Sequence, residues 1–310
     1  MRQNEYCYEG KLLATEQNKK LCSCREGLIF AMNEGIILEG MSYLCDSDRR
    51  LRVHLGEFEG IIPDGECIYT HEGTRAKEIA VISRVGKPVC FMVTDIIDGT
   101  PILSRAKAQK ECHAKKLSFL CAGDVIEAKI TRLDPFGAFC DIGCGIISLL
   151  PIDCMSVSRI SHPRDRFRNG QVIKAVVKNP PDEFGRITLT HRELLGTWEE
   201  NAYRFTPGQT AAGIVRSVED YGIFVELTPN LAGLAEYRDD VTVGQSAAVY
   251  IKNIIKNRMK VKLAIIDSAD CSCPASVYEY PEIEHISRWK YSPDCCDKVI
   301  ESVFDSEINT

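Results

Sequence analysis

The sequence lacks any long run of apolar residues. No stretch in its 310 residues approaches the roughly 20 apolar residues that a membrane-spanning helix needs. The N-terminus, MRQNEYCYEGKLLATEQNKK, contains no apolar segment of the kind found in secretory signal peptides. We therefore expect neither membrane association nor export, and we predict a cytoplasmic protein.

Recognisable catalytic motifs are missing as well. The sequence has no phosphate-binding P-loop, no H-E-x-x-H zinc motif, no G-x-S-x-G nucleophile turn and no Rossmann fingerprint. Its six histidines do not cluster, and its carboxylates are scattered. We predict that the chain is not an enzyme and that it uses no cofactor and no small-molecule substrate.

Positive charge is not in excess. Lys and Arg number 38 against 44 Asp and Glu, which gives a formal net charge of -6 and a pI of about 5.6. This balance argues against a general binder of polyanions but leaves room for local basic patches. Any affinity for nucleic acid is expected to be modest, local and sensitive to salt.

Cysteine, in contrast, is abundant, with 15 residues. The number is odd, and many cysteines stand where a small apolar residue would fit, such as Cys140. We therefore predict reduced and mostly buried thiols. Four tail thiols, at Cys271, Cys273, Cys295 and Cys296, could hold zinc, but their C-x-C and C-C spacing is not the usual C-x₂-C. A reduced, poorly ordered tail is favoured, and no metal site is predicted.

An internal repeat organises the chain. Residues 123–140, GDVIEAKITRLDPFGAFC, align without a gap with residues 208–225, GQTAAGIVRSVEDYGIFV. The two copies continue with Gly-Gln strands at 170 and 244, and they close with GRITLT and MKVKLA. A weaker third copy precedes them, from about residue 34.

Each copy has short segments of alternating apolar and polar residues, separated by Gly and Pro. About five strands in about seventy residues favour a small closed barrel of the OB type. The predicted fold is mainly β, with tandem five-stranded OB-fold barrels joined by short helices. The predicted organisation is a helical segment at 1–33, a degenerate barrel at 34–107, a helical linker at 108–119, a barrel at 120–192, a helical linker at 193–205, a barrel at 206–267 and a cysteine-containing tail at 268–310.

Two aromatic residues in the second copy, Phe136 and Phe139, stand three apart around a glycine. In a regular strand this spacing points side chains to opposite faces, but a turn at 135–137 would bring both rings onto one surface. Surface rings stack on unpaired bases, whereas core packing is the alternative for any aromatic residue. The arrangement recurs at Tyr221 and Phe224, and this recurrence favours the surface.

Basic residues near these rings are candidates for phosphate contacts. Arg186 is predicted on the closing strand of the second copy, and Lys260 takes its place in the third. The loop SRISHPRDRFR adds Arg159, Arg164 and Arg166, and Lys252 lies in a basic run of the third copy. Such a run alone is more often a solvated strand face.

The strings GDVIEAKITRLDPFGAFCDIG, GQVIKAVV and GRITLTHREL resemble the S1 domain. Over roughly 30–267 the chain is similar to ribosomal protein S1-like proteins of clostridial type, with a specific third copy and a weak first copy. The resemblance implies binding of single-stranded RNA (mRNA) in translation, association with the small ribosomal subunit, and no catalysis.

The family's RNA surface uses two aromatics, a histidine after the third strand, an aspartate in the last loop and an arginine that begins the final strand. In the second copy the resemblance places the aromatics at Phe136 and Phe139 and the arginine at Arg186. The aspartate falls one residue out of register, at Asp182, and Pro151 stands at the histidine position.

The other copies depart further from that pattern. The third copy has Tyr221 and Phe224, with Lys260 for arginine and Glu236 for histidine. The aromatic positions of the first copy are arginines (Arg49 and Arg52), so this copy is expected to dock on protein or contact phosphate. Two alternatives stay open for the whole chain: an RNA chaperone or regulator off the ribosome, and a protein-interaction adaptor that has lost RNA binding.

Overall fold

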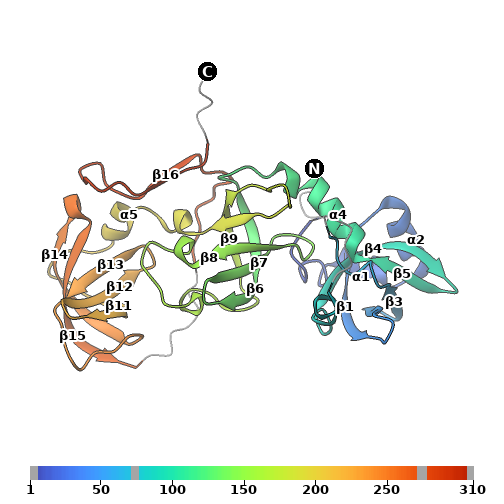
Figure 1. Cartoon of the computed structure of the whole chain (residues 1–310), viewed down its shortest axis with the longest axis horizontal. Helices are drawn as coiled ribbons and strands as arrows, with labels where there is room; N and C mark the ends of the chain where they lie inside the picture. The colour runs from blue at the N-terminus through green and yellow to red at the C-terminus, as the bar shows by residue number, and fades with distance from the viewer. Residues whose placement is uncertain (1–5, 71–76, 271–277, 306–310) are drawn as a thin grey trace, which may run out of the picture. The chain divides into compact units, whose positions relative to one another are not determined.

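The computed structural model of the chain describes residues 6–70, 77–270 and 278–305. Within them lie three closed barrels of five strands each (Figure 1). All three share one topology, in which the first, second and third strands pair in order and the fifth strand lies between the third and the fourth. The third and fifth strands pair in parallel, and the other resolved pairings are antiparallel. The predicted fold class of tandem five-stranded barrels is therefore confirmed.

The strands of the first barrel are β1 (Leu38–Cys45), β2 (Leu51–Leu55), β3 (Phe58–Ile62), β4 (Pro88–Ile97) and β5 (Thr100–Ser104). Those of the second are β6 (Val125–Asp134), β7 (Gly137–Asp141), β8 (Ile147–Pro151), β9 (Val172–Asn179) and β10 (Thr188–Thr190). Those of the third are β11 (Thr210–Glu219), β12 (Gly222–Thr228), β13 (Leu231–Ala235), β14 (Ser246–Ile255) and β15 (Lys260–Ala269). Alternation places Val261 and Leu263 in the core and Lys260 and Lys262 in solvent.

Helices connect and flank the barrels. They are α1 (Glu16–Cys22), α2 (Arg25–Glu34), α3 (Glu78–Ile82), α4 (Arg105–Lys115) and α5 (Trp198–Ala202). The hydroxyl of Ser104 accepts a hydrogen bond from the Lys107 amide at 2.8 Å and caps α4. Thr197 and Glu200 form a capping box at α5. No helix among the described residues is long and apolar enough to cross a membrane.

The chain divides into two compact units. The first unit holds residues 1–120 together with two loops of the second barrel, 141–148 and 180–186. The second unit holds the rest of the second barrel, the third barrel and the C-terminal segment. Cysteines among the described residues are free thiols, and most of them are buried, as predicted. Cys271 and Cys273 lie outside the described residues.

The C-terminal segment 278–305 is ordered, so the expectation of a poorly ordered tail is wrong for these residues. It carries two short paired strands, β16 (Arg288–Lys290) and β17 (Glu301–Val303). Trp289 and Tyr291 enter the core of the third barrel, and the hydroxyl of Tyr280 lies 2.9 Å from Nε2 of His191 beside the second. The segment has too few residues for a core of its own, and its aromatic side chains are buried against the barrels instead.

The burial of His191 leads to a prediction about how stability depends on pH. Burial lowers the pKa of His191 to about 4, whereas an unfolded histidine titrates near 6.5. The unfolded chain therefore binds the extra proton first, and His191 should cost stability as the pH falls from about 6.5 toward 4. We expect the free energy of unfolding of the natural protein, relative to a His191→Gln variant, to decline over that range in denaturant titrations. A difference that does not change with pH would contradict a buried neutral imidazole.

Candidate nucleic-acid interface

The aromatic pair of the second barrel lies at the surface. Phe136 is 55% exposed and occupies the turn between β6 and β7, outside the regular alternation of a strand. Phe139 is half-buried on β7, and the two ring centroids are 5.8 Å apart at an interplanar angle of 89°. The turn predicted at 135–137 thus brings both rings together, and a role of Phe136 in the core is excluded.

Glycine between the two rings has a packing reason. A Cβ on Gly137 would lie 2.6 Å from the carbonyl oxygen of Leu150 on β8. In the third barrel, a Cβ on Gly222 would lie 2.5 Å from the carbonyl oxygen of Ala235, and the φ of Gly222 is +146°. Only glycine lets the third strand approach so closely, which explains the shared aromatic-Gly-x-Phe pattern.

Arg132 is a cation beside the pair that the sequence did not single out. Its guanidinium lies over the Phe139 ring, 4.4 Å from the centroid, and it is paired with Asp134 at 2.6 Å. The side chain is exposed, so the guanidinium is accessible to an anion from solvent. The repeat alignment includes Arg132, but the contact depends on which β6 residue lies beside Phe139.

The third barrel repeats the aromatic geometry. Tyr221 is 70% exposed in the turn between β11 and β12, and Phe224 is half-buried on β12. Their ring centroids are 6.1 Å apart at 85°. Lys260, at the start of β15, is exposed, and exposed Lys252 on β14 is paired with Glu236 at 2.7 Å. Lys252 lowers the pKa of Glu236, so this carboxylate stays charged but has a cationic partner.

Arg186 lies in the loop that precedes β10, not on the closing strand itself. Nε of Arg186 donates to a carboxylate oxygen of Asp182 at 2.8 Å, and the guanidinium lies 4.8 Å from the centroid of the Phe184 ring. The other carboxylate oxygen of Asp182 accepts the backbone amides of Phe184 and Arg186. These bonds lower the pKa of Asp182 and shape a turn that exposes Arg186.

The arginine loop of the second barrel serves two roles. Arg159 and Arg164 are exposed, as a phosphate contact requires. Arg166 is 1% exposed, and its guanidinium donates to both carboxylate oxygens of Glu226 on β12, at 2.9 and 2.6 Å. The prediction of Arg166 as a phosphate contact is therefore wrong, because its side chain is buried in an ion pair that joins the second barrel to the third.

The first barrel has no aromatic pair at the corresponding positions. Arg49 is paired with Asp64 at 3.4 Å, and Arg52 is paired with Glu59 at 2.7 Å. Nearby, the exposed rings of Tyr43 and His54 stack at 4.0 Å and 14°. Among the described residues no group of three or more His, Cys, Asp or Glu side chains is placed to hold a metal ion.

Comparison with known families matches residues 121–192 to the S1 RNA binding domain. These residues are the second barrel, with the exposed Phe136 and Phe139. The second barrel is similar to the S1 RNA binding domain. The third barrel, with its equal topology and its Tyr221 and Phe224 pair, is a second copy of the same S1-type architecture.

Bacterial ribosomal proteins are relatives of this S1-like chain. Small ribosomal subunit protein bS1 of Leuconostoc lactis is 33% identical over 174 residues, 54% of this chain and 39% of that protein. The bS1 homolog of Bacillus subtilis is 30% identical over 198 residues, 58% of this chain and 52% of that protein. The bS1 of Staphylococcus aureus strain COL is 33% identical over 180 residues, 53% and 46%. The chain spans about half, or less, of the length of these relatives.

A solved multidomain protein with nucleic acid binding domains from Streptococcus pneumoniae matches 75% of this chain and 73% of its own length. Its identity is 14% and its TM-score is 0.24, and a score this low does not establish a shared arrangement of domains.

Proposed function

We propose that the chain binds single-stranded RNA, with mRNA as its target in translation, in the manner of an S1-like protein. Bases would stack on Phe136 and Phe139 in the second barrel and on Tyr221 and Phe224 in the third. The observation that carries this proposal is the exposed edge-to-face ring pair inside the matched S1 domain. Stacking on exposed rings suits every base, so we expect little sequence preference.

Phosphates would be held by exposed cations of the second and third barrels. Arg132 beside Phe139, Arg186 in the last loop of the second barrel, and Lys260 and Lys252 in the third barrel are the principal candidates. Arg159 and Arg164 add two further exposed cations on the loop before β9. We propose no catalytic reaction for the chain, and we propose that it acts in the cytoplasm.

The salt dependence of RNA binding tests these cations. In fluorescence anisotropy with a labelled short single-stranded RNA, we expect the affinity to fall as salt rises, with a log–log slope of about 0.7 per phosphate contact. Arg186→Gln and Lys260→Gln should each weaken binding at low salt and flatten the slope by about one contact. Lys20→Gln, an exposed lysine on α1, is the matched control and should leave the slope unchanged. An affinity that is equal at low and high salt would rule out phosphate contacts.

The relatives are named as proteins of the small ribosomal subunit, and we extend this partner to the chain as a proposal. Co-sedimentation with small subunits separates it from an RNA chaperone or regulator that acts off the ribosome. Recovery of the protein in the subunit fraction at physiological salt is the expected result. RNA binding without co-sedimentation would favour the free regulator.

A protein-interaction adaptor is the second candidate. Pro151 and Glu236 stand where the family has a histidine, and the net charge is -6. Both features weaken the case for RNA binding. If the natural protein failed to bind RNA at low salt, the adaptor would become the better proposal.

A further inference from the structure

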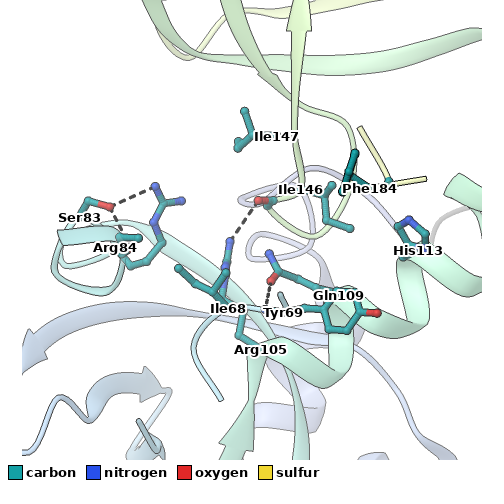
Figure 2. A pocket seen from close by; sticks show the side chains of 13 residues that line it. Ile68, Tyr69, Ser83, Arg84, Arg105, Gln109, His113, Ile146, Ile147 and Phe184 are labelled. Atoms are coloured by element: carbon teal, nitrogen blue, oxygen red, sulfur yellow. Dashed lines mark hydrogen bonds between the residues drawn. The ribbon is translucent and has the colours of Figure 1, made fainter. Parts of the chain in front are cut away.

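The first unit contains a pocket that is separate from the aromatic pairs. Its volume is about 330 Å³, within the range of small-molecule sites. Its walls come from the first barrel, from α3 and α4, and from the two second-barrel loops that belong to this unit. Figure 2 shows Arg84 on one side of the pocket and His113 and Phe184 on the other, with Arg105, Gln109 and Tyr69 along the floor.

Arg105 and Glu9 form a buried ion pair next to this pocket. Nε of Arg105 donates to Oε1 of Glu9 at 2.6 Å, and the guanidinium also donates to the carbonyl oxygens of Cys67 at 3.1 Å and Gly145 at 3.4 Å. Oε1 of Glu9 also accepts the backbone amide of Cys90 at 3.1 Å. Arg105 is thus the main ionic partner of Glu9.

Arg84 is the cation that this arrangement leaves poorly bonded. Its side chain is 22% exposed, and the closest partners of its guanidinium are Oγ of Ser83 at 3.5 Å and Oε2 of Glu9 at 3.8 Å. Good hydrogen bonds to guanidinium are about 2.7–3.2 Å long. Burial, together with the charge of Arg105, lowers the pKa of Arg84. A largely desolvated guanidinium without a short hydrogen bond among the described residues is a ready partner for an anion.

The remaining nearby carboxylate does not supply that partner. Oδ1 of Asp141 accepts the amides of Gly143 at 2.9 Å and Gly145 at 3.0 Å, and Oδ2 accepts the amide of Glu9 at 2.8 Å. Burial and the charge of Glu9 raise the pKa of Asp141 to about 6. Asp141 therefore bonds to backbone amides and not to Arg84.

The other walls favour a ligand with a flat ring. Phe184 presents a half-exposed ring, and Tyr69 and His113 add two more rings to the lining. Ile146 and Ile147 complete an apolar side of the pocket. Aromatic and apolar walls hold a base, while guanidinium holds phosphate.

We propose that this pocket binds one nucleoside phosphate, with the phosphate on Arg84 and the base against Phe184 and the neighbouring rings. The nucleotide can come from two sources, a free nucleotide or one residue of an RNA strand. This proposal does not depend on the stacking role of Phe136 and Phe139, which lie in the other unit.

Calorimetric titration of the full chain with each of the four nucleoside 5′-monophosphates tests the proposal. We expect at least one to bind at millimolar concentration or below, and the matching nucleoside without phosphate to bind far more weakly. Arg84→Met should weaken the nucleotide by about tenfold or more, because it removes a charge-assisted contact. Arg50→Met is the matched control, since Arg50 is paired with Asp46 and Asp48 and does not line the pocket.

Phe184→Leu is a second variant that keeps an apolar side chain at an exposed position, and it should also weaken the nucleotide. Displacement of the bound nucleotide by a short single-stranded RNA would identify the strand as the source, and retention would identify a free nucleotide. Absence of binding by all four nucleotides, or equal affinity in the natural protein and Arg84→Met, would overturn the proposal. If Arg84→Met lost nucleotide binding but still bound RNA, the RNA-binding role of the two aromatic pairs would be unaffected. The RNA-binding proposal and the nucleotide proposal can therefore fail independently.

Discussion

Replacement of Phe136 and Phe139 by alanine is expected to weaken binding of a short single-stranded RNA by about 1–3 kcal/mol for each ring lost. Phe136 is exposed and the two rings meet edge to face, so a stacked base would cover a preformed surface. Loss of the Phe139 ring also removes the surface on which Arg132 lies. Fluorescence anisotropy at low salt, with the single and double variants, measures the effect.

The control for this prediction is Tyr203→Ala. Tyr203 is 91% exposed beside α5 and lies outside both aromatic pairs, so its loss should change RNA affinity little. Thermal melting of every variant separates lost stacking from lost folding, and Phe136→Ala disturbs the barrel least because its ring is the more exposed. If the double variant and the natural protein had equal affinity for RNA, the second barrel would not contribute to RNA binding.

Replacement of Arg166 by methionine is expected to lower the free energy of unfolding by about 1.5–3 kcal/mol. Arg166 and Glu226 are both buried, and the substitution leaves the carboxylate of Glu226 with Arg216 as its remaining cationic partner. Oγ of Ser156, which accepts hydrogen bonds from Nε and Nη2 of Arg166, loses those bonds as well. Denaturant titration followed by circular dichroism measures the change.

Arg164→Met is the matched control, because Arg164 is exposed two residues earlier in the same loop. Its effect should stay within about 0.5 kcal/mol. A double variant, Arg166→Met with Glu226→Leu, should recover part of the loss because neither position then carries a buried charge, and Arg216 keeps Asp165 at 3.3 Å as a partner. If Arg166→Met were as stable as the natural protein and lowered RNA affinity instead, Arg166 would be a phosphate contact after all.

The barrels could be predicted from the sequence because the patterns that specify their strands and turns are local. Alternating residues such as those of β15, and the repeat of an aromatic-Gly-x-Phe turn, are visible along the chain. The turn at 135–137 was likewise predictable, since three-residue spacing needs a break in alternation for Phe136 and Phe139 to share a face.

Long-range contacts explain what the sequence could not predict. Burial of Arg166 depends on Glu226, which lies 60 residues further along the chain. The structure of the C-terminal segment could not be predicted from its own sequence pattern. Its Trp289 and Tyr291 pack into the core of the third barrel, and this long-range contact stabilises the segment. The role of Arg132 is not visible in the sequence, because its cation–π contact with Phe139 arises only when β6 and β7 pair.

The measurement that tests RNA binding by the two aromatic pairs most directly is ultraviolet crosslinking of a short uridine-rich single-stranded RNA to the full chain. The crosslinked residues are then mapped by mass spectrometry. We expect crosslinks in the peptides that contain Phe136 and Phe139 and in those that contain Tyr221 and Phe224, and we expect these crosslinks to be lost at high salt. Crosslinks confined to the C-terminal segment 278–305, or RNA binding that crosslinks none of these four rings, would contradict this expectation.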